Sequence, residues 1–413
     1  SLAAAGFGDE LASVGGLDSL MYAVTVFRKP YGVHRDIQRN VCRAIFHIVR
    51  TVHHLLNTAD NRVLCHDLRE FVVKLRNRTN LVEVQVMCSA ILLLLGGEMD
   101  DFIFQNNMTN CVRKLKYLVY GGNKKKELAG AYAVALLNEI VIGHRAYFSE
   151  AGGFEMLNSL AASSNEAASS VAANAITSLL SNEMANASKL LYDGGKEAIE
   201  NLVRSKASNL QIAGFKIVAA AAAYDFGREM VLVSDRCFLW IDAIVADPEA
   251  QIALAQAIAA LVVHGGATSA VRMFDGGLMN AMNRLLIDCS YQRVSSRSLE
   301  TLGLLVNLEQ EIEEDEREVM EDMFVLASST PVVDKIEKHL QHAEDAFVFR
   351  AVYALEATAR HGRNMEEFNR ETLIKSVLTL LYVEDSDLVL LLLRFLELSA
   401  SHLGLKERLR QLE

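Results

Sequence analysis

The amino-acid sequence predicts an all-α fold: an array of helical repeats in which no single repeat can bury its apolar side alone. The main evidence is a glycine pair followed by an apolar helical pattern, found at Gly152–Gly153, Gly194–Gly195 and Gly276–Gly277. The pairs lie about 41 residues apart or about twice that distance, a spacing typical of helical repeats. A missing middle turn is therefore expected near residue 236. Only 3 prolines occur in 413 residues and strand signals are almost absent, which favours helices throughout.

Each turn is followed by a longer apolar helix, which we expect to face the core. In the central block these helices are predicted over 167–180, 210–224, 250–263 and 294–306. Their apolar residues, such as Leu254, Ile258 and Leu261, recur every three or four positions, which is the helical period. The alanine run 219–223 lets neighbouring helices approach closely and keeps helix propensity high.

Weaker turn signals extend the series of repeats towards both ends of the chain. They are expected at Gly15–Gly16, 64–67, 105–107, 319–324 and 371–374. We predict about eight or nine repeats in one elongated domain over 1–413. The best-defined repeats cover 127–308, and less regular ones cover 319–413. The chain opens at Ser1, within an apolar pattern, so we expect a fragment of a longer polypeptide.

Charge, cysteine content and hydropathy limit the classes of function. A net charge of −11 argues against general nucleic-acid binding, which needs a basic face. The 6 cysteines contain no CxxC pair, so we expect buried thiols in a reducing compartment. We expect a cytoplasmic protein, with the cytoskeleton or the nucleus as further locations. We expect no membrane insertion, because the most apolar stretch, 377–398, is interrupted by the polar residues 384–387.

The ends of the longer helices carry the pattern of a known family. The pattern occurs at Ala135–Glu139, at Ser178–Asn182 and at Leu304–Leu308, where it reads Leu-Leu-Val-Asn-Leu. With the Gly-Gly turn and a short helix ending in Leu, it is similar to the armadillo repeat, and the outer repeats are equally similar to HEAT repeats. The resemblance implies a right-handed superhelical α-solenoid of three-helix units, whose third helices line a concave groove. It places Asn138 and Asn307 in that groove.

The resemblance does not extend to the import adaptors of the armadillo family. Those adaptors read basic peptides with repeated Trp and Asn residues on successive third helices. This chain has a single tryptophan, Trp240, which lies after a turn and so on a different helix. Ser181 also replaces the asparagine of one repeat. We therefore do not expect a classical nuclear-import adaptor.

A polar stripe marks the helix predicted over 36–56. Arg43, His47, Arg50 and His54 follow one another at steps of three or four residues, which places them on one side of a helix. The apolar residues of this helix fall on the other side. If the helix is the last of its repeat, the resemblance puts the stripe on or near the groove, where it would grip acidic side chains with a pH-dependent strength. The alternative is an ordinary solvated face.

Two further charged segments lie between predicted helices. The acidic run 309–318 is interpreted as a solvated loop, with the docking of a basic segment as the alternative. We also expect the stacking of helices to break there. The Gly-Gly-Asn-Lys-Lys-Lys run at 121–126 lacks the spacing of a phosphate-binding loop and is interpreted as a solvated loop between repeats.

No set of residues in the sequence assembles a catalytic, cofactor-binding or metal site. We therefore expect a non-enzymatic scaffold that holds a partner protein's peptide or helix in its groove. The candidate partner-binding residues are Arg43, His47, Arg50, His54, Asn138 and Asn307. One alternative is a chaperone domain similar to the myosin-directed (UCS) armadillo proteins. Another is a regulatory domain that receives a small GTPase, like the armadillo-type region of formins.

Overall fold

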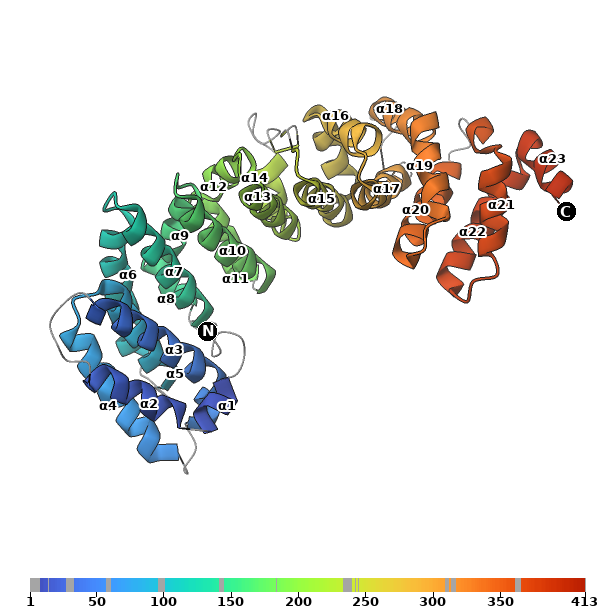
Figure 1. Cartoon of the computed structure of the whole chain (residues 1–413). Coiled ribbons are helices and arrows are strands. Elements are labelled where there is room, and N and C mark those ends of the chain that lie inside the picture. The colour runs from blue at the N-terminus through green and yellow to red at the C-terminus, as the bar shows by residue number, and fades with distance from the viewer. Residues whose placement is uncertain are drawn as a thin grey trace. The chain divides into compact units, whose positions relative to one another are not determined.

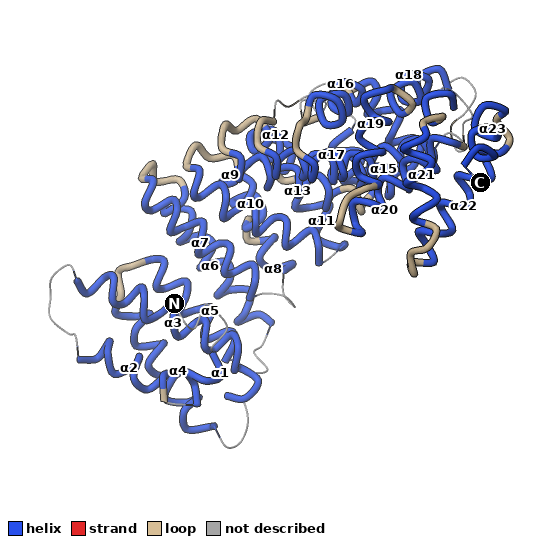
Figure 2. The backbone as a smooth tube through the Cα atoms, turned by 45° about the vertical axis from the view of Figure 1, so that its right-hand side comes forward, coloured by secondary structure: helices blue, strands red, loops and turns tan. Residues whose placement is uncertain are grey.

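The computed structural model confirms the predicted fold class. It describes residues 8–13, 15–26, 33–56, 61–95, 101–140, 145–182, 184–232, 240–241, 243, 245–308, 312, 317–360 and 365–412. Within these ranges every regular element is a helix and no strand occurs (Figure 1, Figure 2). The helices group into two compact units, 1–195 and 196–413. The number of repeats, the superhelical hand and the single domain over 1–413 stay predictions.

Unit 1 is built from eleven described helices. They are α1 (Gly8–Ser13), α2 (Gly16–Val26), α3 (Val33–Leu56), α4 (Arg62–Arg78), α5 (Val82–Leu95), α6 (Asp101–Val119), α7 (Lys124–Ile140), α8 (Arg145–Glu150), α9 (Gly153–Ala161), α10 (Glu166–Asn182) and α11 (Met184–Tyr192). The long helices α3, α5, α7 and α10 pack on one another in succession, and α4, α6 and α9 pack beside α5, α7 and α10. Helices α8, α9 and α10 follow one another as a group of three, whereas α4–α5 and α6–α7 pack as pairs.

The glycine turns of unit 1 lie where the sequence predicted them. Gly152 and Gly194 adopt left-handed backbone conformations, with φ of 85° and 92°, directly before α9 and before the helix that begins at Gly195. Glycine is favoured there because a Cβ atom is strained at positive φ. Asn158, which is 2% exposed, donates from Nδ2 to the Leu190 carbonyl (2.6 Å) and the Asp193 carbonyl (2.9 Å). One repeat therefore holds the turn of the next.

Two of the weaker turns in unit 1 were placed wrongly. Residues 64–67 lie within α4, and 105–107 lie within α6. The polar residues His66, Asp67 and Gln105 are exposed on these helices, so they mark a solvated helix face rather than a turn. The turn at Gly15–Gly16 is present, with φ of 72° at Gly15 before α2.

Unit 2 continues the pattern from the turn at Gly195. Its elements are α12 (Gly195–Val203), α13 (Ser208–Ala221), α14 (Asp225–Leu232), α15 (Pro248–Asp275), α16 (Leu278–Asn283), the π-helix η4 (Arg284–Asp288), α17 (Gln292–Asn307), α18 (Arg317–Ala327), α19 (Thr330–Leu340), α20 (Asp345–Ala359), the 3₁₀ helix η7 (Met365–Phe368), α21 (Glu371–Leu380), α22 (Ser386–Ala400) and α23 (Leu403–Leu412). The long helices α13, α15, α17, α20 and α22 pack in succession, and we call them the long-helix row of unit 2 (Figure 1).

The turns of unit 2 agree with the sequence in part. Gly277 has a φ of 96° before α16, and Gly266 (φ 54°) breaks α15, so that 267–275 becomes the first helix of the next repeat. The segment 319–324 was predicted as a turn and its helix, but it lies inside α18, and the true turn precedes α19. The predicted middle turn near residue 236 and most of the acidic run 309–318 lie outside the described residues.

The expected break in stacking after residue 308 is wrong for the long-helix row. Helices α17 and α20 pack directly on each other, as do α20 and α22. Gly303 allows the close approach, since a Cβ atom at this position would lie 2.7 Å from Tyr353 Cδ1. The row therefore continues past the acidic run.

Helix α15 is long and apolar enough, by length and composition, to cross a membrane. The stretch 377–398 is divided between two helices, α21 and α22, as the sequence predicted from its polar residues. In α15 the backbone breaks at Gly266, and residues such as Ile258 and Leu261 are fully buried while α13 and α17 pack on the helix. We interpret α15 as a core helix, and the absence of membrane insertion stays a prediction.

Candidate polar groove

The long-helix row of unit 2 carries a hollow of about 590 Å³, which we call the polar groove. It is lined by residues of four helices, namely Ile212 and Lys216 of α13, Glu249, Ile252, Ala253 and Gln256 of α15, Arg293 and Arg297 of α17, and Ala346, Phe347 and Arg350 of α20, together with Glu344. These side chains converge because residues on one face of each helix follow the helical period.

Two arginines of the polar groove share one carboxylate. Glu300 Oε2 lies 2.7 Å from Arg297 Nη1 and 3.0 Å from Arg350 Nε. The Arg350 side chain is only 17% exposed, and burial, followed by the charge of Arg297, lowers the pKa of its guanidinium. Arg350 Nη1 also donates to Ser296 Oγ at 3.3 Å. The groove thus holds two converging cations on neighbouring helices.

The rim of the polar groove carries a second ion pair. Arg293 Nη1 lies 2.6 Å from Glu249 Oε1, and both side chains are more than half exposed. Asp247 caps the start of α15 by accepting hydrogen bonds from the amides of Glu249 and Ala250. The cap fixes where α15 begins and therefore where Glu249 stands beside α17. An exposed pair of this kind adds little stability and exchanges readily with other partners.

One predicted groove asparagine lies on the same row. Asn307, at the end of α17, donates from Nδ2 to the Tyr353 hydroxyl of α20 at 3.1 Å. Its Oδ1 is buried and has no hydrogen-bond partner among the described residues. Because this oxygen is buried, a bound partner has no access to it, and the described contact of Asn307 is a link between α17 and α20. Its Tyr353 partner is the ring that packs over Gly303.

The other predicted asparagine has a different setting. Asn138 of α7, in unit 1, is 2% exposed, and its Oδ1 has no partner in the part of the chain that the structure describes. A side chain buried to this degree presents almost no surface to a partner. Asn138 and Asn307 belong to different units.

The polar stripe of α3 is only partly exposed. Arg43 and His47 are half-buried and Arg50 is exposed, while the side chain of His54 lies outside those described. Ile45, on the opposite side of α3, is buried as predicted. The Arg43 guanidinium lies over the Tyr132 ring of α7, 5.6 Å from its centroid. The stripe therefore borders the row formed by α3, α5 and α7, and its role in binding stays a prediction.

Replacing both Arg43 and Arg50 with Glu should leave the fold of unit 1 intact. We expect the free energy of unfolding to change by about 1 kcal/mol or less, mainly through the lost contact of Arg43 with Tyr132. Circular dichroism and urea unfolding would measure this, with Tyr132→Leu as the control that removes the same contact without changing charge. A loss of helicity in the double variant would mean that the stripe is buried.

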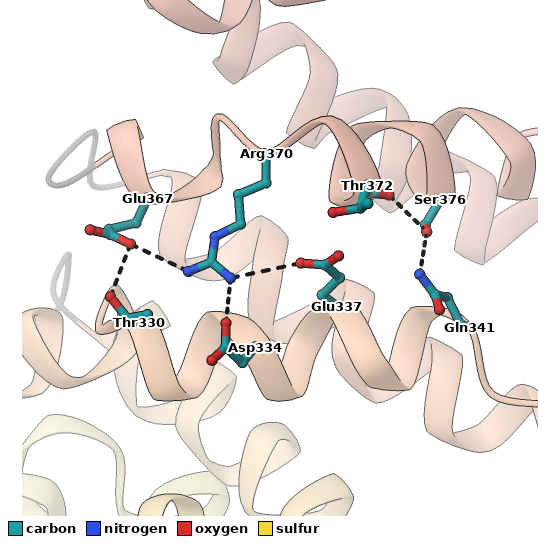
Figure 3. Close-up of polar contacts among 8 residues, drawn as sticks. All are labelled: Thr330, Asp334, Glu337, Gln341, Glu367, Arg370, Thr372 and Ser376. Atoms are coloured by element: carbon teal, nitrogen blue, oxygen red, sulfur yellow. Dashed lines mark hydrogen bonds and ion pairs between the residues drawn. The ribbon is translucent and has the colours of Figure 1, made fainter.

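A separate charged cluster joins α21 to α19 (Figure 3). Arg370 contacts the carboxylate of Asp334 and lies 3.7 Å from Glu337 and 3.4 Å from Glu367. The hydrogen bond to Asp334 is the main reason why the pKa of Arg370 is raised. Thr330 Oγ1 in turn donates to Glu367 at 3.1 Å. Because its guanidinium is already surrounded by carboxylates of the same chain, we interpret Arg370 as a link between repeats.

Other polar segments show no arrangement for chemistry. The described residues contain no group of three or more His, Cys, Asp or Glu side chains placed to hold a metal ion. Residues 121–123 form an exposed turn, and Asn123 Oδ1 accepts from the Lys125 amide at the start of α7. The five described cysteines are buried, and none of these five forms a disulfide. The Sγ atoms of Cys42 and Cys88, on neighbouring helices, lie 3.7 Å apart.

The arginines of the polar groove were not predicted from the sequence. Arg293, Arg297 and Glu300 follow the helical period within a helix that was predicted correctly, so their common face could have been noticed. Arg350 lies beyond the acidic run, and the break expected there separated it from α17. Its proximity to Glu300 follows only from the packing of α20 on α17.

Comparisons with known proteins identify no relative by sequence: no protein-family model matches, and no curated protein does. Similar solved structures include an engineered protein with a TM-score of 0.49 and 18% identity, covering 92% of this chain and 98% of that chain. Others are computationally designed armadillo repeat proteins for modular peptide recognition, with a TM-score of 0.40, 12% identity and coverage of 70% and 99%. A designed armadillo repeat protein in complex with the peptide (KR)4 has a TM-score of 0.39, 13% identity and coverage of 70% and 98%.

Proposed function

We propose that this protein is a non-enzymatic scaffold that binds a segment of a partner protein in the polar groove of unit 2. The observation that carries the proposal is the convergence of Arg297 and Arg350 from two neighbouring helices on one carboxylate. Apolar side chains, including Ile252 and Phe347, line the same groove. Polar groups that fix orientation within a partly apolar hollow are typical of binding sites.

A bound segment has a supply of polar contacts along the row. The side-chain amide of Gln256, which is exposed in the groove, can donate to or accept from the main chain of a bound segment. The arginines hold side chains by charge-assisted hydrogen bonds, which are stronger than neutral ones. Main-chain contacts give affinity, and local charge gives selectivity.

Site-specific photo-cross-linking to a defined peptide library tests this proposal. A photoreactive amino acid replaces Gln256, which is exposed in the groove, or, as the matched control, Tyr382, which is 92% exposed outside it. We expect peptides to be captured from position 256 and not from position 382. Equal capture from both positions, or capture from neither, would contradict the proposal.

The same proposal places the protein in the cytoplasm, where buried thiols such as Cys42 and Cys88 stay reduced. The chaperone and small-GTPase alternatives predict a folded client instead of a peptide segment. They would be favoured if the peptide library gave no capture from position 256 while a folded domain did.

A further inference from the structure

We propose that the polar groove selects a partner segment that carries a glutamate or aspartate, and that its carboxylate binds between Arg297 and Arg350. This inference rests on the proposed function and specifies the chemistry of the partner. The structure already contains the corresponding contact within the chain. Glu300 places one carboxylate oxygen within 2.7 Å of Arg297 and 3.0 Å of Arg350, so the two guanidiniums are positioned to receive such a group.

Glu300 does not use the full binding capacity of the two arginines. Each guanidinium has five N–H donors. The contacts described for the groove use one nitrogen of Arg297 and two of Arg350. One carboxylate also leaves a net positive charge on the cluster. A second carboxylate, from a partner, would therefore complete the hydrogen bonding and neutralise the pair.

The surroundings of this pair are cationic although the whole protein is acidic. The groove is lined by four cationic side chains and two carboxylates, and Glu300 stands beside them, which leaves one net positive charge. The chain as a whole has a formal net charge of −11. At physiological salt, charges more than about 8 Å apart are largely screened, so the local charge decides which side chain enters.

Other segments fit this cluster less well. A lysine- or arginine-rich segment would meet two arginines of the same charge, and a neutral segment would leave their remaining donors unpaired. Arg350 is shielded from solvent, with 17% of its side chain exposed, so an unpaired contact there costs more than at the surface. A phosphate group offers similar oxygens, but the distances from Arg297 Nη1 and Arg350 Nε to Glu300 Oε2 show that the two guanidiniums already fit around a single carboxylate oxygen.

Fluorescence anisotropy with labelled peptides tests this inference on the full chain. The probe is a Glu-Ala repeat peptide, compared with Gln-Ala, Lys-Ala and phosphoserine-Ala repeats of equal length. The variants are Arg297→Gln and Glu300→Gln. The matched control is Arg272→Gln, because Arg272 is a part-exposed arginine of α15 that pairs with Glu229 outside the groove. Circular dichroism verifies that each variant is folded.

We expect the Glu-Ala peptide to bind the wild-type protein, and salt to weaken this binding. Arg297→Gln should raise the Kd about tenfold, the usual effect of losing one hydrogen bond to a charged group. Glu300→Gln should lower the Kd several-fold, since it removes the competing carboxylate of the same chain. Arg272→Gln should leave the Kd unchanged.

Several outcomes would overturn the inference, and they separate it from the proposed function. If Arg297→Gln and Arg272→Gln bind the Glu-Ala peptide equally, the carboxylate site is wrong. Tighter binding of the Lys-Ala, Gln-Ala or phosphoserine-Ala peptide would also contradict it. If one of these three peptides is captured from position 256, the scaffold function is supported, and only the preference for a carboxylate is wrong. If none of the four peptides binds, the carboxylate site is wrong, and the scaffold function is decided separately by whether library peptides are captured from position 256.

Discussion

Replacing Ile258 with Ala should destabilise unit 2 by ~2 to 5 kcal/mol, the range found when a large aliphatic side chain is removed from a core. Ile258 is fully buried on α15, and this helix packs on both α13 and α17. The cavity left by the missing atoms would loosen both contacts at once. In a repeat array stability depends on the interfaces between neighbours, so the loss should spread to the adjacent helices.

Urea unfolding followed by circular dichroism would measure the effect of Ile258→Ala. Val263→Ala is the matched control, because Val263 lies on the same helix and is 62% exposed. We expect the control to stay within about 0.5 kcal/mol of the wild-type protein. Hydrogen exchange should show lost protection in α13 and α17 for Ile258→Ala alone. Equal unfolding curves for the two variants would show that α15 does not form the core.

The central repeats could be predicted from the sequence because their turns require glycine. Gly152, Gly194 and Gly277 share a left-handed backbone conformation that other residues adopt only with strain. Glycine at these positions therefore identifies the turns in the sequence. The turn before α4 carries no such glycine pair, whereas the pair Gly96–Gly97 precedes α6 in the sequence but was not used to place its turn. Both turns were placed at polar residues instead, and such residues occur on helix faces and in turns alike.

The polar groove could not be predicted in the same way, because its residues come from different repeats. Periodicity placed Arg297 and Glu300 on one helix. It carries no information about the offset between α17 and α20, which depends on how closely the two helices approach at Gly303. The resemblance pointed to Asn307 and Asn138 alike, but Asn307 is half-buried at the end of α17 whereas Asn138 is fully buried, and the role of both in binding stays a prediction.

A histidine in the core should make the stability of unit 2 depend on pH. His339 of α19 is 1% exposed, and its Nε2 lies 2.8 Å from Ser295 Oγ of α17. Its Nδ1 has no hydrogen-bond partner among the residues described. Burial, and then the nearby positive charges of His342 and Lys338, lowers its pKa to about 4. The folded protein therefore keeps this ring neutral at neutral pH.

The sign of the pH effect follows from which state of the protein, folded or unfolded, binds more protons. The unfolded chain protonates this histidine near its ordinary pKa of about 6.5, and the folded chain only near 4. Between these values the unfolded state holds more protons, so the free energy of unfolding falls as the pH falls. A single titrating group changes the free energy of unfolding by up to about 1.4 kcal/mol per pH unit. We expect a loss of about 2 kcal/mol between pH 6.5 and pH 5 from His339.

Urea unfolding at pH 7, 6 and 5 would isolate this contribution by comparing variants. His339→Gln should be less stable than the wild-type protein at pH 7, because packing is lost, but its stability should fall less steeply towards pH 5. Ser295→Ala is the control: it removes the hydrogen bond to His339 and keeps the titrating ring, so it should lose about 1 kcal/mol at pH 7 and keep most of the pH dependence. All other titrating groups are common to the three proteins, so the difference in slope belongs to His339. Equal slopes for His339→Gln and the wild-type protein would mean that this ring is accessible to protons in the folded state.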